Sequence, residues 1–157
     1  DTFTREQLGT HDLLLPSSRL VTRGFWYVIG DHVTSAAGLG PAELPGALHA
    51  AEHAGIGILP LFAICDRWDV GGVSTPYLPE TGAATIVIHD AFPGGAGVAE
   101  LGCAAADRHL PATLEVIESC TCANGCPSCI QSPKCGNGNE PLDKAAAVLL
   151  LQAMLSR

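Results

Sequence analysis

Five of the seven cysteines lie within sixteen residues, between Cys120 and Cys135, in a segment rich in glycine, proline and asparagine. Such a segment buries little apolar surface by itself, so a bound metal would give it a reason to fold. Cys126 and Cys129 form a C-x-x-C pair, which places two thiolates on one tight turn, and zinc favours four such ligands in a tetrahedron. Cys120 and Cys122 are the nearest second pair. The spacing therefore predicts one structural zinc ion held by Cys120, Cys122, Cys126 and Cys129.

Cys135 is one cysteine more than the tetrahedron needs. It could replace Cys120 or Cys122 as a ligand, or it could be a buried thiol. Disulfides fit less well, because the count is odd, the chain is not small and the thiols are clustered. Metal binding in a reducing cytosol is the better interpretation, and it predicts a cytoplasmic protein. Cys65 and Cys103 lie in apolar surroundings and are predicted to be core residues.

A complete set of four thiolates leaves no open position on the metal for water or substrate. Gly125 and Pro127 give the loop its turn geometry, as a structural zinc loop requires. The zinc is therefore predicted to be structural, and no catalytic residue and no further cofactor is predicted.

A length of 157 residues suits one domain with a single hydrophobic core. We expect that domain to cover residues 1–157, with its zinc loop at about residues 119–141. All apolar runs are far shorter than the ~20 residues of a membrane-spanning helix. The chain opens at Asp1 without a signal peptide, so we interpret it as a piece of a longer protein.

The formal net charge is −8, and the pI is about 5.0. Binding to a phosphate backbone is driven mainly by clustered lysine and arginine side chains. The composition therefore weighs against autonomous binding to nucleic acid. Any DNA contact would be shared with other domains, or local and based on Arg19, Arg23, Lys134 or Lys144.

Two segments have the composition of strands. Residues 19–29 are rich in β-branched and aromatic side chains and end at a turn-like Gly30-Asp31 pair, and residues 84–90 form an apolar run. Residues 69–82 are crowded with glycine, proline, serine and threonine, and are predicted to form a long loop or an irregular hairpin.

Four segments have helical composition or spacing. They are the first half of residues 41–65, broken or kinked by Gly55, Gly57 and Pro60; residues 97–109; residues 111–117; and the amphipathic residues 142–155. Strands and helices mix without a regular alternation. The predicted fold class is therefore α+β, with a small sheet, an Ala-rich helical layer and the cysteine loop before the C-terminal helix.

Residues 49–53 spell H-x-x-E-H, a signature in which two histidines one helical turn apart bind zinc and the glutamate acts as a base. A zinc metallopeptidase using His49, Glu52 and His53 is therefore one alternative function. A match of this length arises easily by chance, however, and the segment runs into apolar residues. We interpret His49 and His53 as packed or surface histidines of an ordinary helix.

Two further patterns have both a functional and a structural interpretation. The Pro93-to-Gly97 turn stands between a strand and a helix, where free N–H groups could bind an anion, but a tight packing turn is favoured because no nucleotide-loop spacing is present. Asp90 and Glu100 flank it without a nucleophile or metal beside them. Aromatic side chains, which could stack on single-stranded bases, are interpreted as core anchors; they are Phe25, Trp26, Tyr27 and Trp68.

Several separated segments resemble a known family. They are residues 22–29, 68–90, 89–102 and 125–151, which include the motifs TRGFWYVI, WDVGGVSTPYLPETG, HDAFPGGAG and GCPSCIQSPKCGNGNEPLD. Together they resemble the C-terminal zinc-binding domain of superfamily 2 DEAD/DEAH-type DNA helicases of the MrfA and SftH type. The resemblance covers nearly the whole chain.

This resemblance implies a module attached to the RecA-like motor domains of a longer parent chain, an ATP-dependent 3′-to-5′ DNA helicase linked to DNA repair. It implies a four-cysteine zinc site and DNA contact through the parent, with no membrane partner. The sequence itself contains no G-x-x-x-x-G-K-[ST] phosphate loop and no DEAD/DEAH box, so the chain alone is not expected to be an enzyme. A stand-alone protein-interaction domain is the other alternative.

Overall fold

The computed structural model describes residues 4, 9 and 14–156. Its sheet has three antiparallel strands in the order β1-β3-β2, and β3 (Ala83–Asp90) lies in the middle. β1 (Gly24–Ile29) pairs with one edge of β3, so that Tyr27 lies opposite Ile86. β2 (Val70–Leu78) pairs with the other edge through a hairpin. The apolar run of β3 is thus the most buried strand, as expected for the centre of a sheet.

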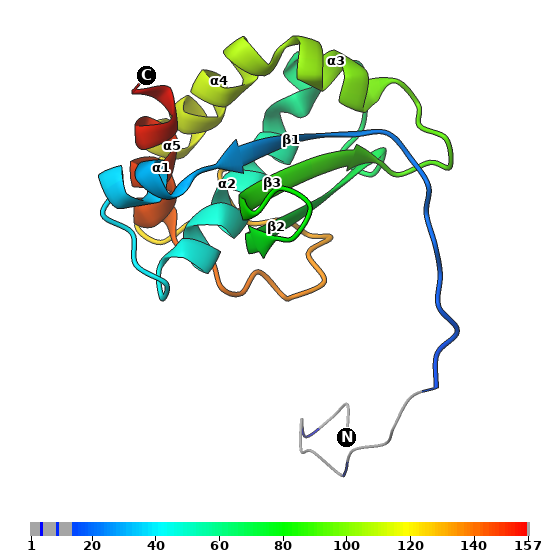
Figure 1. The fold of residues 1–157 in the computed structure, drawn as a ribbon, viewed down its shortest axis with the longest axis horizontal. Coiled ribbons are helices and arrows are strands. Elements are labelled where there is room, and N and C mark those ends of the chain that lie inside the picture. The colour runs from blue at the N-terminus through cyan, green and yellow to red at the C-terminus, as the bar shows by residue number, and fades with distance from the viewer. Residues whose placement is uncertain (1–3, 5–8, 10–13, 157) are drawn as a thin grey trace.

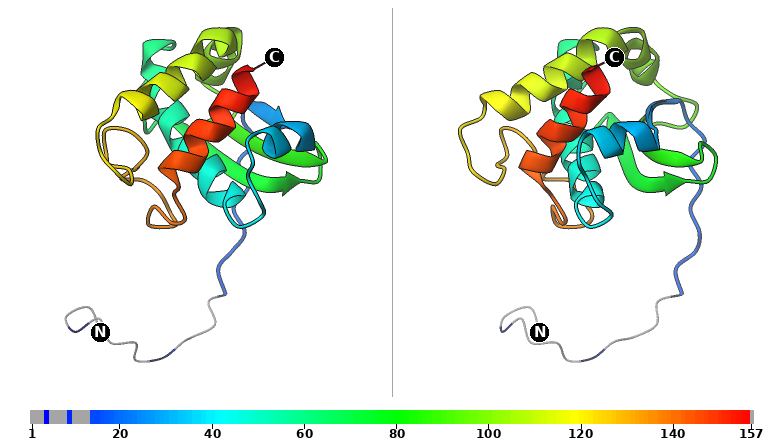
Figure 2. Two further views of the ribbon diagram at one scale, coloured as in Figure 1. Left: turned by 90° about the vertical axis from the view of Figure 1, so that its left-hand side faces the viewer. Right: turned by 60° about the vertical axis from the view of Figure 1, so that its left-hand side comes forward.

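Six helical elements accompany the sheet in the described part of the chain (Figure 1). The central helix α2 packs on β2 and β3 on one side and on α4 and α5 on the other (Figure 2). The elements are α1 (Asp31–Ala36), α2 (Leu44–Ile58), the 3-10 helix η1 (Leu59–Leu61), α3 (Val98–Ala104), α4 (Ala106–Ser119) and α5 (Lys144–Leu155). None of the described helices is long and apolar enough to cross a membrane.

The main core lies between α2, α4, α5 and the sheet. Ala47, Ala50, Ala51 and Ala54 line α2 and are almost fully buried, and such small side chains let the neighbouring elements approach closely. Ile130, from the cysteine loop, is fully buried in the same cluster. The α+β prediction with a small sheet, an Ala-rich helical layer and a cysteine loop before the last helix is confirmed.

Of the predicted break or kink at the glycines of the first helix, the break does not occur. α2 runs through Gly55 and Gly57 and ends only at Ile58, where η1 takes Pro60 in its second position. A Cβ atom at position 55 would lie 3.2 Å from Cε1 of His109, so the glycine makes room for a neighbouring helix instead of ending its own. Tertiary packing thus overrides the low helix propensity of glycine.

Other boundaries also differ from the sequence predictions. The predicted strand at residues 19–29 begins only at Gly24, and the expected turn at Gly30-Asp31 is the start of α1. Pro111 lies inside α4, whose start is Ala106. α5 begins at Lys144, where Asp143 caps it by accepting the N–H of Ala146 at 2.9 Å.

Candidate metal centre

The four predicted zinc ligands converge in the loop after α4; they are Cys120, Cys122, Cys126 and Cys129. Their Sγ atoms form four close pairs: Cys120 with Cys122 at 3.5 Å, Cys120 with Cys126 at 3.5 Å, Cys122 with Cys129 at 3.5 Å, and Cys126 with Cys129 at 3.8 Å. Zn–S bonds of ~2.3 Å in a tetrahedron place sulfurs about 3.8 Å apart. The cluster therefore fits one tetrahedral zinc ion. The same distances exceed the ~2.05 Å of a disulfide, and all seven cysteines, each in the described part of the chain, are free.

The turn that holds two of these thiols is built from backbone hydrogen bonds. The carbonyl oxygen of Cys126 accepts the N–H groups of Cys129 at 3.0 Å, Ile130 at 3.2 Å and Gln131 at 3.1 Å. Gly125 has φ of 105°, and a Cβ atom there would lie 2.4 Å from Cδ1 of Ile130. Position 125 therefore requires glycine for its backbone conformation and for the space that buried Ile130 occupies.

Hydrogen bonds favour the thiolate form of Cys126, whereas burial opposes it at Cys129. A backbone hydrogen bond from Ser128, together with the neighbouring Cys120 thiol, lowers the pKa of Cys126 to about 6. Burial and the adjacent cysteines raise the pKa of Cys129 to about 12. Four thiols this close cannot all ionise without a compensating cation, and a divalent metal supplies that charge.

Lys144 connects the cluster to the last helix. Its ammonium donates hydrogen bonds to the carbonyl oxygens of Cys120 at 2.5 Å and Cys122 at 2.7 Å, and lies 3.5 Å from Sγ of Cys122. The sequence predicts this lysine only as a candidate DNA contact. The structure uses it at the cysteine loop, where a cation stabilises sulfur charge.

Cys135 lies outside this cluster. Its Sγ atom is 3.4 Å from Nε2 of His49, and His53 lies beside them on α2. His49 and His53 are both 9% exposed and therefore packed, which was one of the two environments expected for them. Burial lowers the pKa of His53 and raises the pKa of Glu52 on the same helix. Of the two remaining cysteines, Cys65 is half-buried against a second, smaller core cluster that includes Phe25 and Ile88. Cys103 is exposed, so the prediction that Cys103 belongs to the core was wrong.

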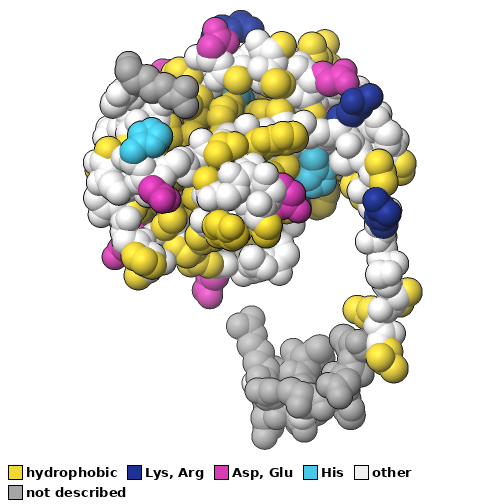
Figure 3. All heavy atoms as spheres, in the orientation of Figure 1, with side chains coloured by type: hydrophobic (Ala, Val, Ile, Leu, Met, Phe, Trp, Pro, Cys, Tyr) yellow, Lys and Arg dark blue, Asp and Glu magenta, His cyan; other side chains and the backbone are white. Residues whose placement is uncertain are grey.

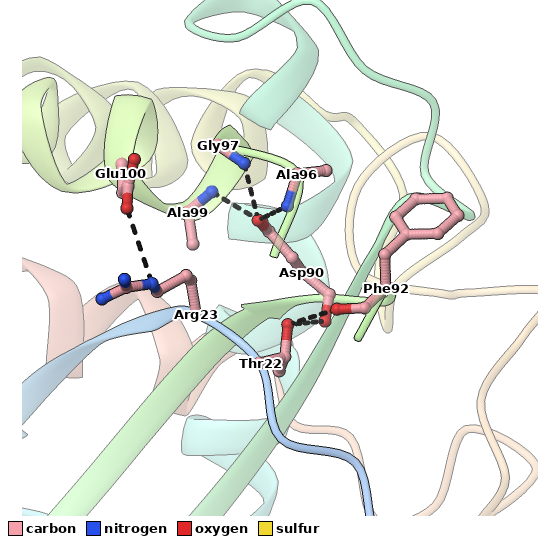
Figure 4. Close-up of polar contacts among 8 residues, drawn as sticks. All are labelled: Thr22, Arg23, Asp90, Phe92, Ala96, Gly97, Ala99 and Glu100. Carbon is pink, nitrogen blue, oxygen red and sulfur yellow. Dashed lines mark hydrogen bonds and ion pairs between the residues drawn. The ribbon is translucent and has the colours of Figure 1, made fainter. Parts of the chain in front are cut away.

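The glycine turn after β3 already has an anion of its own. The carboxylate of Asp90, which is fully buried, accepts the N–H groups of Ala96 at 2.5 Å and Gly97 at 2.9 Å through Oδ2, and that of Ala99 at 2.7 Å through Oδ1 (Figure 4). These are the groups that an external phosphate would need. The turn is therefore structural, which is the interpretation favoured from the sequence. Glu100, the other carboxylate that flanks the turn, forms an ion pair with Arg23 at 3.8 Å.

The aromatic side chains divide between core and surface. Phe25 is 5% exposed and Tyr27 is half-buried, whereas Trp26 is 56% exposed and Trp68 is 64% exposed. The expectation that all four are core anchors was therefore wrong for both tryptophans. Trp26 points away from the core because it alternates with buried Phe25 along β1.

Basic side chains form no stripe on the face in Figure 3, where lysine and arginine occur singly. The ammonium of Lys134 donates to the carbonyl oxygens of Arg67 and Val70. With Lys144 engaged at the cysteine loop, the two lysines proposed as a local DNA site are both bound to backbone oxygens. Arg19 remains exposed.

Comparison with known proteins gives the family. A family model described as the MrfA Zn-binding domain matches residues 51–130, a segment that contains the four clustered cysteines and ends before Cys135. An uncharacterised protein of Methanocaldococcus jannaschii is 41% identical over 112 residues, which are 69% of this chain and 100% of that protein. The ATP-dependent helicase YprA of Bacillus subtilis is 34% identical over 81% of this chain.

A solved structure supports the same assignment. The crystal structure of the DUF1998 helicase MrfA bound to DNA matches 96% of this chain with a TM-score of 0.72 and 30% identity. The chain spans only 19% of that protein and 17% of YprA. The family model covers half of the sequence, and the fold, the cysteine cluster and the relatives agree with it. The chain thus belongs to the MrfA Zn-binding domain family.

Proposed function

We propose that the chain is a zinc-stabilised, non-catalytic C-terminal accessory domain of an ATP-dependent 3′-to-5′ DNA helicase or translocase that acts in DNA repair. In this proposal the domain braces the RecA-like motor domains of the parent chain or guides DNA along them. One observation carries the proposal: nearly the whole chain matches one part of a helicase structure that is bound to DNA.

We propose Cys120, Cys122, Cys126 and Cys129 as the zinc ligands of this domain. Their sulfur separations of 3.5–3.8 Å suit a tetrahedral ion, and four thiolates leave no open coordination position for a substrate. The zinc then stabilises the fold, because the loop places Ile130 in the main core. Such thiolate ligation also suits a reducing compartment, so we place the protein in the cytoplasm.

The charge of the chain supports DNA contact through the parent. The formal charge of −8 becomes about −10 once four thiolates and one Zn²⁺ are counted. A body of this charge repels a phosphate backbone on average. Bracing the motor, or a contact shared with it, is therefore favoured over independent DNA binding.

The test separates ATP hydrolysis from unwinding in a parent helicase that carries this domain. Cys126→Ser with Cys129→Ser should reduce strand unwinding strongly while DNA-stimulated ATP hydrolysis by the motor domains persists. Cys103→Ser is the matched control, since this thiol is exposed and distant in sequence from the loop. Normal unwinding by the double variant would contradict the proposal.

The relative from Methanocaldococcus jannaschii favours a second candidate function, a stand-alone protein-interaction domain. That protein is matched over its entire length, so the domain occurs there without attached motor domains. The two candidate functions predict different coding sequences on either side of this domain. RecA-like motor motifs in the same reading frame support the helicase proposal, and stop codons on both sides support the stand-alone domain.

A further inference from the structure

A second group of metal-ligand side chains, separate from the cysteine cluster, consists of His49, His53 and Cys135. His49 and His53 stand one helical turn apart on α2, with ring centroids 4.3 Å apart. Cys135 reaches them from the segment after the cysteine loop. One ligand atom from each of the three side chains lies within 4.8 Å of the other two.

Both imidazole rings are held in one orientation by the backbone. Nδ1 of His49 lies 2.9 Å from the carbonyl oxygen of Pro141, and Nδ1 of His53 lies 2.8 Å from that of Ile130. A carbonyl oxygen can only accept a hydrogen bond, so each Nδ1 carries the proton. In a neutral ring the lone pair is then on Nε2, which is how metal-binding histidines are commonly fixed by a second hydrogen bond. Nε2 of His49 points to Sγ of Cys135 at 3.4 Å.

The thiol of Cys135 is also positioned before any metal binds. Its Sγ atom accepts the backbone N–H of Asn139 at 3.3 Å, which fixes the position of the sulfur. The side chain of Asn139 closes the same turn, since its Oδ1 accepts the N–H of Ser132 at 2.7 Å and its Nδ2 donates to the carbonyl oxygen of Ser132 at 3.1 Å. The third ligand is therefore held by a turn as well defined as that of the cysteine cluster.

The three side chains line a pocket of about 560 Å³ together with Glu52, His89 and Lys134. Glycine at position 72 keeps this space open, because a Cβ atom there would lie 2.6 Å from Oε1 of Glu52. The ammonium of Lys134 is tied to two backbone carbonyl oxygens at the start of β2. A metal bound to one thiolate and two neutral imidazoles carries net positive charge, which the nearby Glu52 carboxylate can offset.

We propose that His49, His53 and Cys135 bind a second Zn²⁺ ion, with a fourth coordination position open to this pocket. Two imidazoles and one thiolate suit a borderline metal such as zinc, and a three-residue ligand set with an open position is the arrangement of zinc sites that bind water or an exogenous ligand. This proposal gives the two histidines a metal-binding role, whereas the sequence alone favours packed or surface histidines without one. The site also does not depend on the proposed helicase role, because its ligands are separate from the four-cysteine cluster.

The test counts zinc in the full 157-residue chain. Protein equilibrated with buffered Zn²⁺ and freed of unbound metal should hold two equivalents by elemental analysis, whereas Cys135→Ser and His53→Gln should each hold one. The matched controls are Cys103→Ser and His32→Gln, at exposed positions, and both should hold two. Circular dichroism checks that each variant is folded.

The result is decided by Cys135→Ser if His53→Gln does not fold, since serine nearly preserves the size of the side chain. A wild-type chain that binds one equivalent under these conditions overturns the second site, and so does a folded Cys135→Ser variant that still binds two. Either outcome leaves the four-cysteine site and the helicase proposal unaffected. Substitution with Co²⁺ gives a second readout, because sulfur-to-cobalt charge-transfer absorption at the second equivalent should disappear in Cys135→Ser.

Discussion

The ammonium of Lys144 lies 3.5 Å from Sγ of Cys122 while it donates to the carbonyl oxygen of the same residue at 2.7 Å. The first residue of α5 thus places a positive charge beside the predicted zinc thiolates. It also ties the cysteine loop to a helix whose Leu150 and Leu151 belong to the main core. The loop and the C-terminal helix should therefore be stabilised together.

Lys144→Met should weaken zinc binding at the cysteine loop by roughly 10–100-fold, the range for loss of a group that supports metal ligands. The affinity is measured by competition with a chelator in a Cys135→Ser background, which removes the proposed second site. Lys144→Arg retains the charge and should lose less affinity. Equal zinc affinities for the Cys135→Ser protein with and without Lys144→Met would show that the lysine has no influence on the metal.

Two helical glycines should respond in opposite directions to alanine. At Gly102 an added Cβ would lie 2.6 Å from Cε1 of Phe25, which is buried, so Gly102→Ala should destabilise the fold by about 1–3 kcal/mol through overpacking. At Gly57 nothing lies within 4 Å of the added atom, so Gly57→Ala should stabilise α2 by roughly 0.5–1 kcal/mol. Urea unfolding of both variants measures the difference, and a stabilising Gly102→Ala would contradict the close contact of α3 with Phe25.

Asp90→Asn should destabilise the protein by about 1–3 kcal/mol, because charge-assisted hydrogen bonds to three backbone N–H groups are weakened in a buried site. Glu100→Gln is the matched control. The Glu100 side chain is 66% exposed in the Arg23 pair, so loss of its charge should change the free energy of unfolding by at most about 1 kcal/mol. Chemical denaturation of the two variants should therefore separate them clearly, and a neutral Asp90→Asn variant would argue against the turn as assigned.

Burial lowers the pKa of His109, whose ring nitrogens lie 2.9 Å from the Tyr27 hydroxyl and 2.9 Å from the carbonyl oxygen of Gly55. The unfolded chain therefore binds a proton near its ordinary pKa of 6.5 while the folded chain does not. Stability from this group is complete above that pKa and decreases as the pH falls below it. Unfolding at pH 7.5 and 5.5 should show a larger loss for the wild type than for His109→Gln, and equal losses would rule out His109 as the cause.

The parts predicted from the sequence are those with local signals. The spacing of Cys120, Cys122, Cys126 and Cys129 falls within ten residues, and the apolar run of β3 is continuous, so both could be recognised without knowledge of the fold. Gly55 was misjudged because its role is to accommodate His109, which lies in another helix. Such contacts depend on tertiary packing and leave no periodic pattern.

The grouping of Cys135 with His49 and His53 also depends on tertiary packing and could not be predicted from the sequence. Eighty-six residues separate Cys135 from His49, and only the packing of the post-cysteine segment on α2 brings them together. The H-x-x-E-H spacing drew attention to the histidines, but it gave no indication that a cysteine would approach them. The exposure of Trp26 and Trp68 was likewise hidden, since strand alternation depends on which face of β1 meets the core.

We propose above that Cys120, Cys122, Cys126 and Cys129 hold a structural zinc ion. The most direct measurement is X-ray absorption combined with elemental analysis on the Cys135→Ser variant, in which the proposed second site is removed. We expect one zinc per chain with four sulfur ligands at about 2.3 Å. Ligation by mostly nitrogen and oxygen, or a folded chain without stoichiometric zinc, would contradict it.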